Sequence, residues 1–170
     1  FPPAGWSTAN PDGGTGWNRG EVGTTPIPGW NGGIITSPFA GAGVAYCTWN
    51  TGGEYSSDQY LVTPQLTLPA GQRLDFWLQK WPDGYMDSVQ VLLSTTGNQA
   101  EDFTIVLADY ILEWYTGNTD WAHHSIDLSA YTGQNVYLAF REYSASNAYT
   151  AAVFIDQVTI GDTPTEPIAY

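Results

Sequence analysis

The chain has 170 residues, of which 42% are hydrophobic and only 12% charged, and its 19 Gly and 11 Pro argue against a disordered or an all-helical protein. This length fits one domain that can bury a core without disulfide bonds. The net charge of −13, with only four basic residues, argues against nucleic acid and anionic membranes as partners, because Lys and Arg clusters hold both.

Residues 1–42 form a loop-rich region. Gly and Pro are frequent in it, and Trp6, Trp17 and Trp30 are spaced along it, which favours turns over regular structure. We expect only short strands here, near Trp6 and near Trp17.

From residue 43 onward, the chain shows the period-2 alternation of β-strands separated by turn residues. The expected strands are 43–49, 59–63, 73–81, 87–95, 103–109, 121–128, 135–143 and 152–160. Leu74, Phe76 and Leu78, for example, share one face of their strand. Residues 110–115 are too few to distinguish a helical turn from a strand. So many short strands predict an all-β protein with two sheets, a sandwich or a barrel.

The ends of the chain suggest an excised or processed domain. Pro164 and Pro167 mark 163–170 as a linker or tail, so we expect a single β-sandwich domain over 1–162. Phe1 is not Met, and neither a signal-peptide pattern nor an 18-residue apolar stretch is present. We therefore expect no membrane insertion.

Cys47 is the only cysteine, and it lies in the apolar run 43–49 with no histidine nearby in the sequence. This setting favours a buried structural thiol over a reactive one. Low cysteine content suits the cytosol and a secreted bacterial protein equally. The eight Trp and eleven Tyr, with a single Lys, favour a secreted or cell-surface location.

A set of motifs recurs in order along almost the whole chain. They are FPPAGW (1–6), NPDGG (10–14), SDQYLVTP (57–64), MDSVQVLLSTTG (86–97), IDLSAYTG (126–133), VYLAFR (136–141) and FIDQVTI (154–160). Together they resemble the cleaved-adhesin or choice-of-anchor J domains of secreted bacterial proteins, which are related in architecture to MAM domains. The resemblance implies a two-sheet antiparallel jelly-roll β-sandwich, export, bound Ca²⁺, and a non-catalytic adhesion or accessory role beside other domains of the same polypeptide.

Two motifs depart from that family. Its D-x-D-G-D-G start is here NPDGGT (10–15), and its I-D-D-V is here IDQV (155–158). Each change removes a carboxylate, so the number of calcium sites stays open.

The acidic residues include four candidate calcium ligands, because hard carboxylate oxygens with few cations nearby favour Ca²⁺. Asp58 precedes one expected strand and Asp87 begins another, so loops can bring them together at one end of a sandwich. By resemblance, Asp87 stands where the family carries Glu. Asp156 lies in an apolar strand, where a carboxylate needs a metal or a cation such as Arg141. Asp12 could contribute from a loop. Turn capping is the alternative for Asp58 and Asp87, and an ion pair with Arg141 or a solvent-facing position is the alternative for Asp156.

The alternation also assigns a place to Arg141. Val136, Leu138 and Phe140 point inward, so Arg141 lies on the opposite face of the strand. We expect it to be a structural cation that neutralises neighbouring acids.

Two other possible metal-binding motifs match their known patterns poorly. Asn10, Asp12, Gly14 and Glu21 have EF-hand spacing, but Thr15 stands where the loop requires Gly. The adjacent His123 and His124 would point to opposite faces of a strand, which argues against a zinc centre.

Five aromatic residues border expected turns, where a ring can stack on a sugar or on a protein partner. These candidate ligand-binding residues are Trp81, Tyr85, Trp114, Tyr115 and Trp121. Hydrophobic packing at the base of the loops is the alternative.

These observations predict a non-catalytic, calcium-stabilised extracellular module that binds a protein or a glycan. A carbohydrate-binding module of a secreted hydrolase is the second reading. A jelly-roll glycoside hydrolase is the third, but it needs two carboxylates facing one cleft, and only Glu142 among the six Glu lies clearly in a strand.

Overall fold

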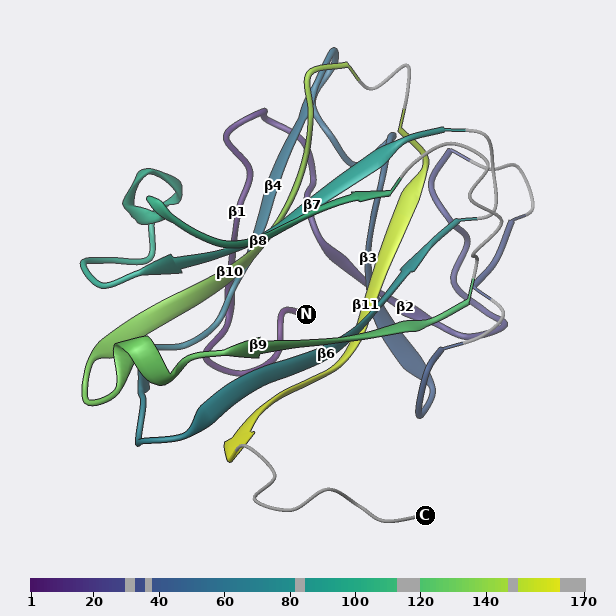
Figure 1. Cartoon of the computed structure of the whole chain (residues 1–170). Coiled ribbons are helices and arrows are strands. Elements are labelled where there is room, and N and C mark those ends of the chain that lie inside the picture. Colours follow the sequence, from purple (N-terminus) through teal and green to yellow (C-terminus); the bar gives the residue numbers. More distant parts are fainter. Residues whose placement is uncertain (30–32, 36–37, 82–84, 113–119, 147–149, 163–170) are drawn as a thin grey trace.

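The alternating strands form two antiparallel β-sheets that face each other (Figure 1). The computed structural model describes residues 1–29, 33–35, 38–81, 85–112, 120–146 and 150–162. Two 3-10 turns, η1 (Ala100–Asp102) and η2 (Ser129–Tyr131), are the helical elements of this part of the chain, and neither has the length to cross a membrane. The predicted two-sheet antiparallel jelly-roll sandwich is confirmed.

The six-stranded sheet has the order β1–β4–β10–β7–β8, with β5 paired to β10. Its strands are β1 (Ser7–Ala9), β4 (Ser57–Val62), β5 (Leu66–Thr67), β7 (Asp87–Ser94), β8 (Ile105–Leu112) and β10 (Asn135–Ser144). The five-stranded sheet has the order β2–β3–β11–β6–β9. Its strands are β2 (Asn18–Glu21), β3 (Gly43–Thr48), β6 (Gln72–Lys80), β9 (Ala122–Asp127) and β11 (Ala152–Asp162).

The main hydrophobic core lies between the sheets. Its central side chains are the inward members of the alternating strands, namely Leu74, Phe76, Leu78, Val89, Val91, Leu93, Val136, Leu138 and Phe140. Each is fully or almost fully buried, which is the source of most of the apolar stabilisation. The inward faces therefore agree with the period-2 pattern of the sequence.

A second, smaller core lies on the outer face of the five-stranded sheet. Ile27 and Ile35, from the loop-rich region, pack there against Val44, Tyr46 and Phe154 of β3 and β11. Part of the region 1–42 is therefore a cover for one sheet face. The expected short strands, β1 and β2, begin directly after Trp6 and Trp17.

Some strand limits differ from the sequence-based expectation. Residues 110–112 continue β8, where they pair with β7, so a helical turn is wrong for these three residues. The end of β11 pairs with β6 through Asp162 and Gln72, and the side chain of Gln72 donates a hydrogen bond to Asp162. The proposed tail 163–170 lies outside the described residues.

Candidate functional site

One end of the sandwich is polar inside. The inward positions of three neighbouring strands change there from apolar to polar, at Gln59 in β4, Asp87 in β7 and Glu142 in β10. Their ends line up because Glu142 lies opposite Gln59, and opposite Val89, which is two residues from Asp87. Asp87 and Glu142 are each only 2% exposed. We call Cys47, Thr51, Gln59, Asp87 and Glu142 the buried polar cluster.

Gln59 connects this cluster by hydrogen bonds. Its Nε2 donates to Oε2 of Glu142 (3.0 Å). Its Oε1 accepts from Oγ1 of Thr51 (3.0 Å) and from Sγ of Cys47 (3.4 Å). The amide is therefore held in one orientation, with its donor side facing the glutamate.

Glu142 carries the strongest electrostatic perturbation of the cluster. Burial raises the pKa of its carboxyl well above the ordinary value, and the nearby charge of Asp87 raises it further. A hydrogen bond from Ser57 works against this shift, while Asp12 and Asp58 add to it. The end of the sandwich thus brings several carboxyl groups together, two of them buried.

Asp12 joins two loops next to the cluster. Its Oδ1 accepts a hydrogen bond from the backbone N–H of Gly14 (2.8 Å). Its Oδ2 accepts from the N–H groups of Gly53 (3.0 Å) and Asp58 (2.8 Å). The loops 10–16 and 50–57 press together so closely that a Cβ on Gly14 would lie 2.3 Å from the carbonyl oxygen of Thr51.

The other predicted metal ligands have separate surroundings. Oδ1 of Asp87 accepts from the N–H of Ala151 (2.9 Å) inside the polar end. Asp58 faces outward from β4. Asp156 lies on β11, in the other sheet, where its Oδ2 accepts from the N–H of Ala40 (3.0 Å). Of the four candidates, Asp87, Asp12 and Asp58 act electrostatically on Glu142, whereas Asp156 lies in the other sheet.

The described residues hold no group of three or more Asp, Glu, His and Cys side chains that could bind a metal ion by themselves. A cation at the polar end would therefore need amide or backbone oxygens as well, and Ca²⁺ accepts such ligands. Oδ1 of Asn10 is one candidate, since it is buried and accepts no hydrogen bond from the described part of the chain. In the sequence, Asn10 stands in the NPDGG motif and in a poor EF-hand match, but it was not counted among the candidate ligands.

Arg141 lies on the outer face of the six-stranded sheet, as expected. Its Nε donates to Oδ1 of Asp58 (2.6 Å), and its Nη1 donates to Oε1 of Gln90 (3.1 Å). The guanidinium also lies 5.3 Å and 5.1 Å from the ring centres of Tyr60 and Tyr143. Arg141 thus neutralises a neighbouring acid, but that acid is Asp58 and the alternative pairing with Asp156 is wrong.

The predicted ligand-binding aromatics divide into three groups. Trp81 packs against Phe154, with ring centres 6.2 Å apart, and Trp121 meets the edge of Phe39, so both contribute to the second core. Tyr85 is 45% exposed. Trp114 and Tyr115 lie outside the described residues.

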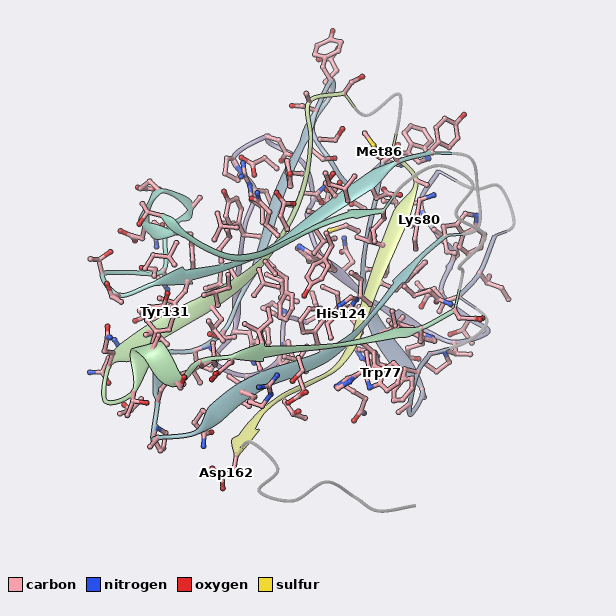
Figure 2. All side chains as sticks on the ribbon, in the orientation of Figure 1. Trp77, Lys80, Met86, His124, Tyr131 and Asp162 are labelled. Atoms are coloured by element: carbon pink, nitrogen blue, oxygen red, sulfur yellow. The ribbon has the colours of Figure 1, made fainter. Side chains whose placement is uncertain are left out.

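Two further exposed side chains lie at the same end as Tyr85. Tyr55 is 76% exposed and precedes β4 by two residues, while Met86 is 40% exposed and directly precedes β7. Both strands run antiparallel to β10, so their first residues lie at one end of the sheet. Figure 2 shows Met86 at the end of the molecule opposite Asp162. We call Tyr55, Tyr85 and Met86 the loop-end surface.

Signals for these residues were present in the sequence. The alternation Val136, Leu138, Phe140 extends by one more step to Glu142, which predicts a buried carboxylate. Tyr55 stands in a run of Gly, Glu and Ser, where a large aromatic residue has little to pack against.

Comparison of the chain with known protein families gives a match over almost its whole length. The family described as Cleaved Adhesin Domain matches residues 2–160. Hemagglutinin A of Porphyromonas gingivalis is 31% identical over 176 residues, which cover 93% of this chain and 6% of that protein. Lys-gingipain W83 of the same organism is 31% identical over 181 residues, covering 95% of this chain and 10% of that protein. The chain thus spans a small part of these relatives.

Solved structures agree with that similarity. The K1 cleaved adhesin domain of Lys-gingipain is 30% identical with a TM-score of 0.68, over 95% of this chain and 92% of that domain. The K3 domain is 29% identical with a TM-score of 0.73, over 95% and 93%. A carbohydrate-binding module, TmCBM61 in complex with β-1,4-galactotriose, is 15% identical with a TM-score of 0.55, over 94% and 90%, and shares the fold.

Proposed function

We propose, from the premise that this chain belongs to the cleaved adhesin domain family, that it is a non-catalytic extracellular adhesion module of a larger bacterial protein. Hemagglutinin A and Lys-gingipain, of which it matches 6% and 10%, support its role as one unit among several. Protein and glycan are both candidate ligands. We also propose that the unit extends over 1–162.

The observation that carries this proposal is the loop-end surface. Three large apolar or aromatic side chains, Tyr55, Tyr85 and Met86, are exposed at one end of the domain, which also exposes Phe1, Phe39, Trp49, Val106 and Ile111. Exposed aromatic residues in loops are typical of contact surfaces, because a ring offers area at little cost in conformational entropy. The rigid sandwich beneath would hold these loops in position.

The placement of the carboxylates supports a non-catalytic role. Asp87 and Glu142 are close enough to affect each other electrostatically, but each is only 2% exposed. Glycoside hydrolysis needs two carboxylates in a cleft that reaches the substrate. The hydrolase reading is therefore the weaker one. The carbohydrate-binding module remains a form of the adhesion proposal, with a glycan as the ligand.

Calcium is part of the proposal. We place a Ca²⁺ ion at the polar end, where the carboxylates of Asp87 and Glu142 would bind it together with amide or backbone oxygens such as Oδ1 of Asn10. Burial raises the pKa of Glu142 and the charge of Asp87 raises it further, which supports this proposal because a divalent cation would relieve the repulsion between the two carboxylates. The ion would join the loops that carry Tyr55 and the start of β7.

A double substitution tests the adhesion surface. Tyr55→Ala with Tyr85→Ala should weaken binding of the domain to erythrocytes or to its best ligand on a glycan array by about tenfold or more. The matched control is Val106→Ala, because Val106 is also more than half exposed but lies near the other end of the sheet, opposite Leu92. Equal loss in the control would overturn the assignment of the surface. Hydrolysis of a glycan that disappears in Glu142→Gln would overturn the non-catalytic reading.

A further inference from the structure

Aromatic rings gather on the outer face of the five-stranded sheet, beside the second core. Trp77 of β6 points to that face, because it lies opposite His123 of β9, whereas its inward neighbour Phe76 lies opposite His124. Figure 2 shows Trp77 on the side of these strands that faces away from the six-stranded sheet. The ring centre of Trp77 is 3.7 Å from that of Phe39, which lies almost parallel to it, and 5.1 Å from that of His123. We call Phe39, Trp77 and His123 the ring cluster.

The ring cluster is open to solvent and fixed to the sheet. Phe39 is 40% exposed, and the side chain of His123 is 48% exposed. The loop that carries Phe39 is tied to β11, since the N–H of Ala40 donates to Oδ2 of Asp156 (3.0 Å). Aromatic rings on a fixed backbone offer contact area that loses little conformational entropy when a partner binds.

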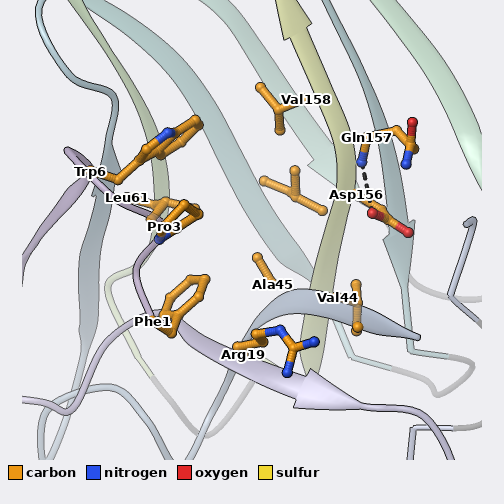
Figure 3. Close-up of a pocket in the computed structure, with 12 residues that line it drawn as sticks. Phe1, Pro3, Trp6, Arg19, Val44, Ala45, Leu61, Asp156, Gln157 and Val158 are labelled. Atoms are coloured by element: carbon orange, nitrogen blue, oxygen red, sulfur yellow. Dashed lines mark hydrogen bonds between the residues drawn. The ribbon is translucent and has the colours of Figure 1, made fainter. Parts of the chain in front are cut away.

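Two carboxylates border the ring cluster. Asp156 lies opposite Trp77 on β11, and Figure 3 shows its side chain on the side of β11 away from Trp6. Asp75 precedes Trp77 by two residues, so it lies on the same face of β6. The Cβ atoms at such positions are about 5 Å and about 7 Å from that of Trp77. Both carboxylates are therefore within reach of a group that rests on the rings.

Neither carboxylate is paired with a Lys or an Arg among the residues that the structure describes. Asp156 accepts from the neutral N–H groups of Ala40 (3.0 Å) and Gln157 (2.8 Å). Oδ1 of Asp75 lies 3.0 Å from Nε2 of His123, which carries charge only when it is protonated. Each carboxylate oxygen can accept more than one hydrogen bond, so both groups keep acceptor capacity for a ligand.

The cations of the chain are engaged at other positions. Arg73 also lies on this face of β6, but it is about 13 Å along the strand from Trp77, and its Nε donates to Oγ of Ser125. The ion pairs of the two remaining arginines are Arg19 with Glu21 and Arg141 with Asp58. With a net charge of −13 for the whole chain, the field at the ring cluster attracts cations and repels anions.

These features select an organic cation as the partner. A divalent metal ion would need more ligands, because the described residues hold no group of three or more Asp, Glu, His and Cys side chains that could bind one. The guanidinium of arginine has a flat face that stacks on aromatic rings, and it donates several N–H groups in one plane to carboxylates. It is also more weakly hydrated than the ammonium of lysine, so it gives up less when it lies on a ring.

We propose that the ring cluster, with Asp75 and Asp156, binds an arginine side chain of a partner polypeptide. The guanidinium rests on the exposed ring of Phe39 and donates to Asp156, while the charge of Asp75 adds to the attraction. This surface shares no residue with the loop-end surface. The proposal therefore goes beyond the adhesion function proposed above and does not depend on it.

Titration of the ¹⁵N-labelled domain with a tetrapeptide of arginine, blocked at both ends, tests the proposal. The peptide should give saturable shifts at the indole N–H of Trp77 and at the backbone amides of Ala40 and Gln157. The citrulline tetrapeptide, which has the same shape without the charge, should bind about tenfold more weakly. The lysine tetrapeptide should bind about threefold more weakly than the arginine peptide. Raising the ionic strength from about 0.01 M to about 0.15 M should weaken binding of the arginine peptide.

Substitutions locate the site. Asp156→Asn and Asp75→Asn should each weaken binding of the arginine peptide about threefold or more. Phe39→Leu should do the same by removing the ring. Glu101→Gln is the matched control for charge, and Phe1→Leu is the control for the ring, because Phe1 is 49% exposed away from the ring cluster. Both controls should bind as the wild type does, and the melting temperature of each variant shows that it is folded.

Several outcomes would overturn the proposal. Equal affinity for the arginine and citrulline peptides is one, and unchanged binding in Asp75→Asn, Asp156→Asn and Phe39→Leu is another. Methyl galactoside that shifts the same amides, with no response to the arginine peptide, would assign this surface to a sugar instead. Tyr55→Ala with Tyr85→Ala should bind the arginine peptide normally, so a failure at the loop-end surface is distinguishable from a failure here.

Discussion

Glu142 shows how far the environment of a single side chain can change its chemistry. Its carboxyl is buried, it accepts a hydrogen bond from Gln59, and its pKa lies well above the ordinary value, first because of burial and then because of Asp87. A raised pKa means that the folded protein binds this proton more tightly than the unfolded chain does. In metal-free protein, the free energy of unfolding should therefore fall as the pH rises from about 4.5 through the folded pKa.

Glu142→Gln should remove the loss of stability at neutral pH, because the Gln amide stays neutral. Its oxygen can still accept a hydrogen bond from Gln59. In EDTA at neutral pH, we expect the variant to be more stable than the wild type, and at about pH 4 the difference should vanish. In excess Ca²⁺ the order should reverse, because the variant lacks a ligand. Urea denaturation with and without EDTA measures both effects, with Glu101→Gln as the exposed control. A variant that is less stable in EDTA at neutral pH would contradict this account.

The contribution of the cation Arg141 to stability also depends on its surroundings. Its side chain is 28% exposed, and that of its partner Asp58 is 29% exposed. Arg141→Ala should lower the free energy of unfolding by about 1 kcal/mol or more, because Asp58 loses its counterion and two tyrosine rings lose a contact. Arg73, whose Nε donates to Oγ of Ser125 at the surface, is the matched control. A loss below about half a kcal/mol in Arg141→Ala would place this network among weak surface pairs.

At the scale of elements, the two loops at the polar end behave as one unit. Asp12 accepts one backbone N–H bond within its own loop and two from Gly53 and Asp58, and Gly14 lies against Thr51 with no room for a side chain. Gly14→Ala should therefore destabilise the domain by about 1–3 kcal/mol. Gly161→Ala is the matched control, since a Cβ there meets nothing within 4 Å, and it should be close to neutral. Equal effects in a chemical denaturation series would show that the loops can move apart.

The edge formed by β8 and β9 contains a histidine between the sheets. The ring centre of His124 lies 5.3 Å from that of Phe76 and 4.3 Å from that of Tyr110. Figure 2 places His124 in the middle of the molecule. Desolvation lowers its pKa below the ordinary 6.5, and the charge of His123 lowers it further. The unfolded chain therefore binds this proton more readily than the folded protein does.

The contribution of neutral His124 to the free energy of unfolding should be fully present above about pH 6.5. It should be lost as the pH falls from there through the pKa of His124 in the folded protein. His124→Phe, which keeps an aromatic ring between Phe76 and Tyr110, should reduce that loss. Comparing the unfolding free energies of both proteins from neutral pH to about pH 5 measures it. Identical pH profiles would show that the ring accepts its proton without opening this edge.

Elements also explain what could be predicted from the sequence. The faces of single strands were predictable, because Leu74, Phe76 and Leu78 alternate strictly and are all buried. The order of the strands was not. Asp156 was a candidate calcium ligand alongside Asp58 and Asp87, but β11 joins the five-stranded sheet while β4 and β7 join the other. The period-2 pattern is the same in either sheet, so it cannot place a strand beside its neighbours.

The pocket that Trp6, Arg19 and Asp156 help to line was unpredictable for the same reason (Figure 3). Trp6 and Arg19 are far from Asp156 in the sequence, and nothing local indicates that β3 and β11 separate between them. The buried polar cluster was predictable only in part. Each of Gln59, Asp87 and Glu142 follows from its own strand, but their alignment depends on the register of β4, β7 and β10.

For the whole molecule, the calcium proposal makes the folded state depend on a ligand. Free Ca²⁺ at a hundred times its Kd should add about 2.7 kcal/mol to the free energy of unfolding. For a domain of this size, this corresponds to a rise in melting temperature of about 5–10 °C. EDTA should reverse it, and Mg²⁺ should replace Ca²⁺ poorly. An unchanged melt after EDTA, on protein first shown by metal analysis to carry calcium, would rule out a stabilising site.

The burial of the single thiol, Cys47, limits when this domain can form a disulfide bond. Cys47 is fully buried in the buried polar cluster, and burial raises the pKa of its thiol well above the ordinary value. Neither an oxidant nor a neighbouring thiol can reach it while the domain is folded. A disulfide bond to Cys47 would therefore form only in molecules whose domain has opened. A disulfide at Cys47 would therefore identify a molecule whose domain opened before the bond formed.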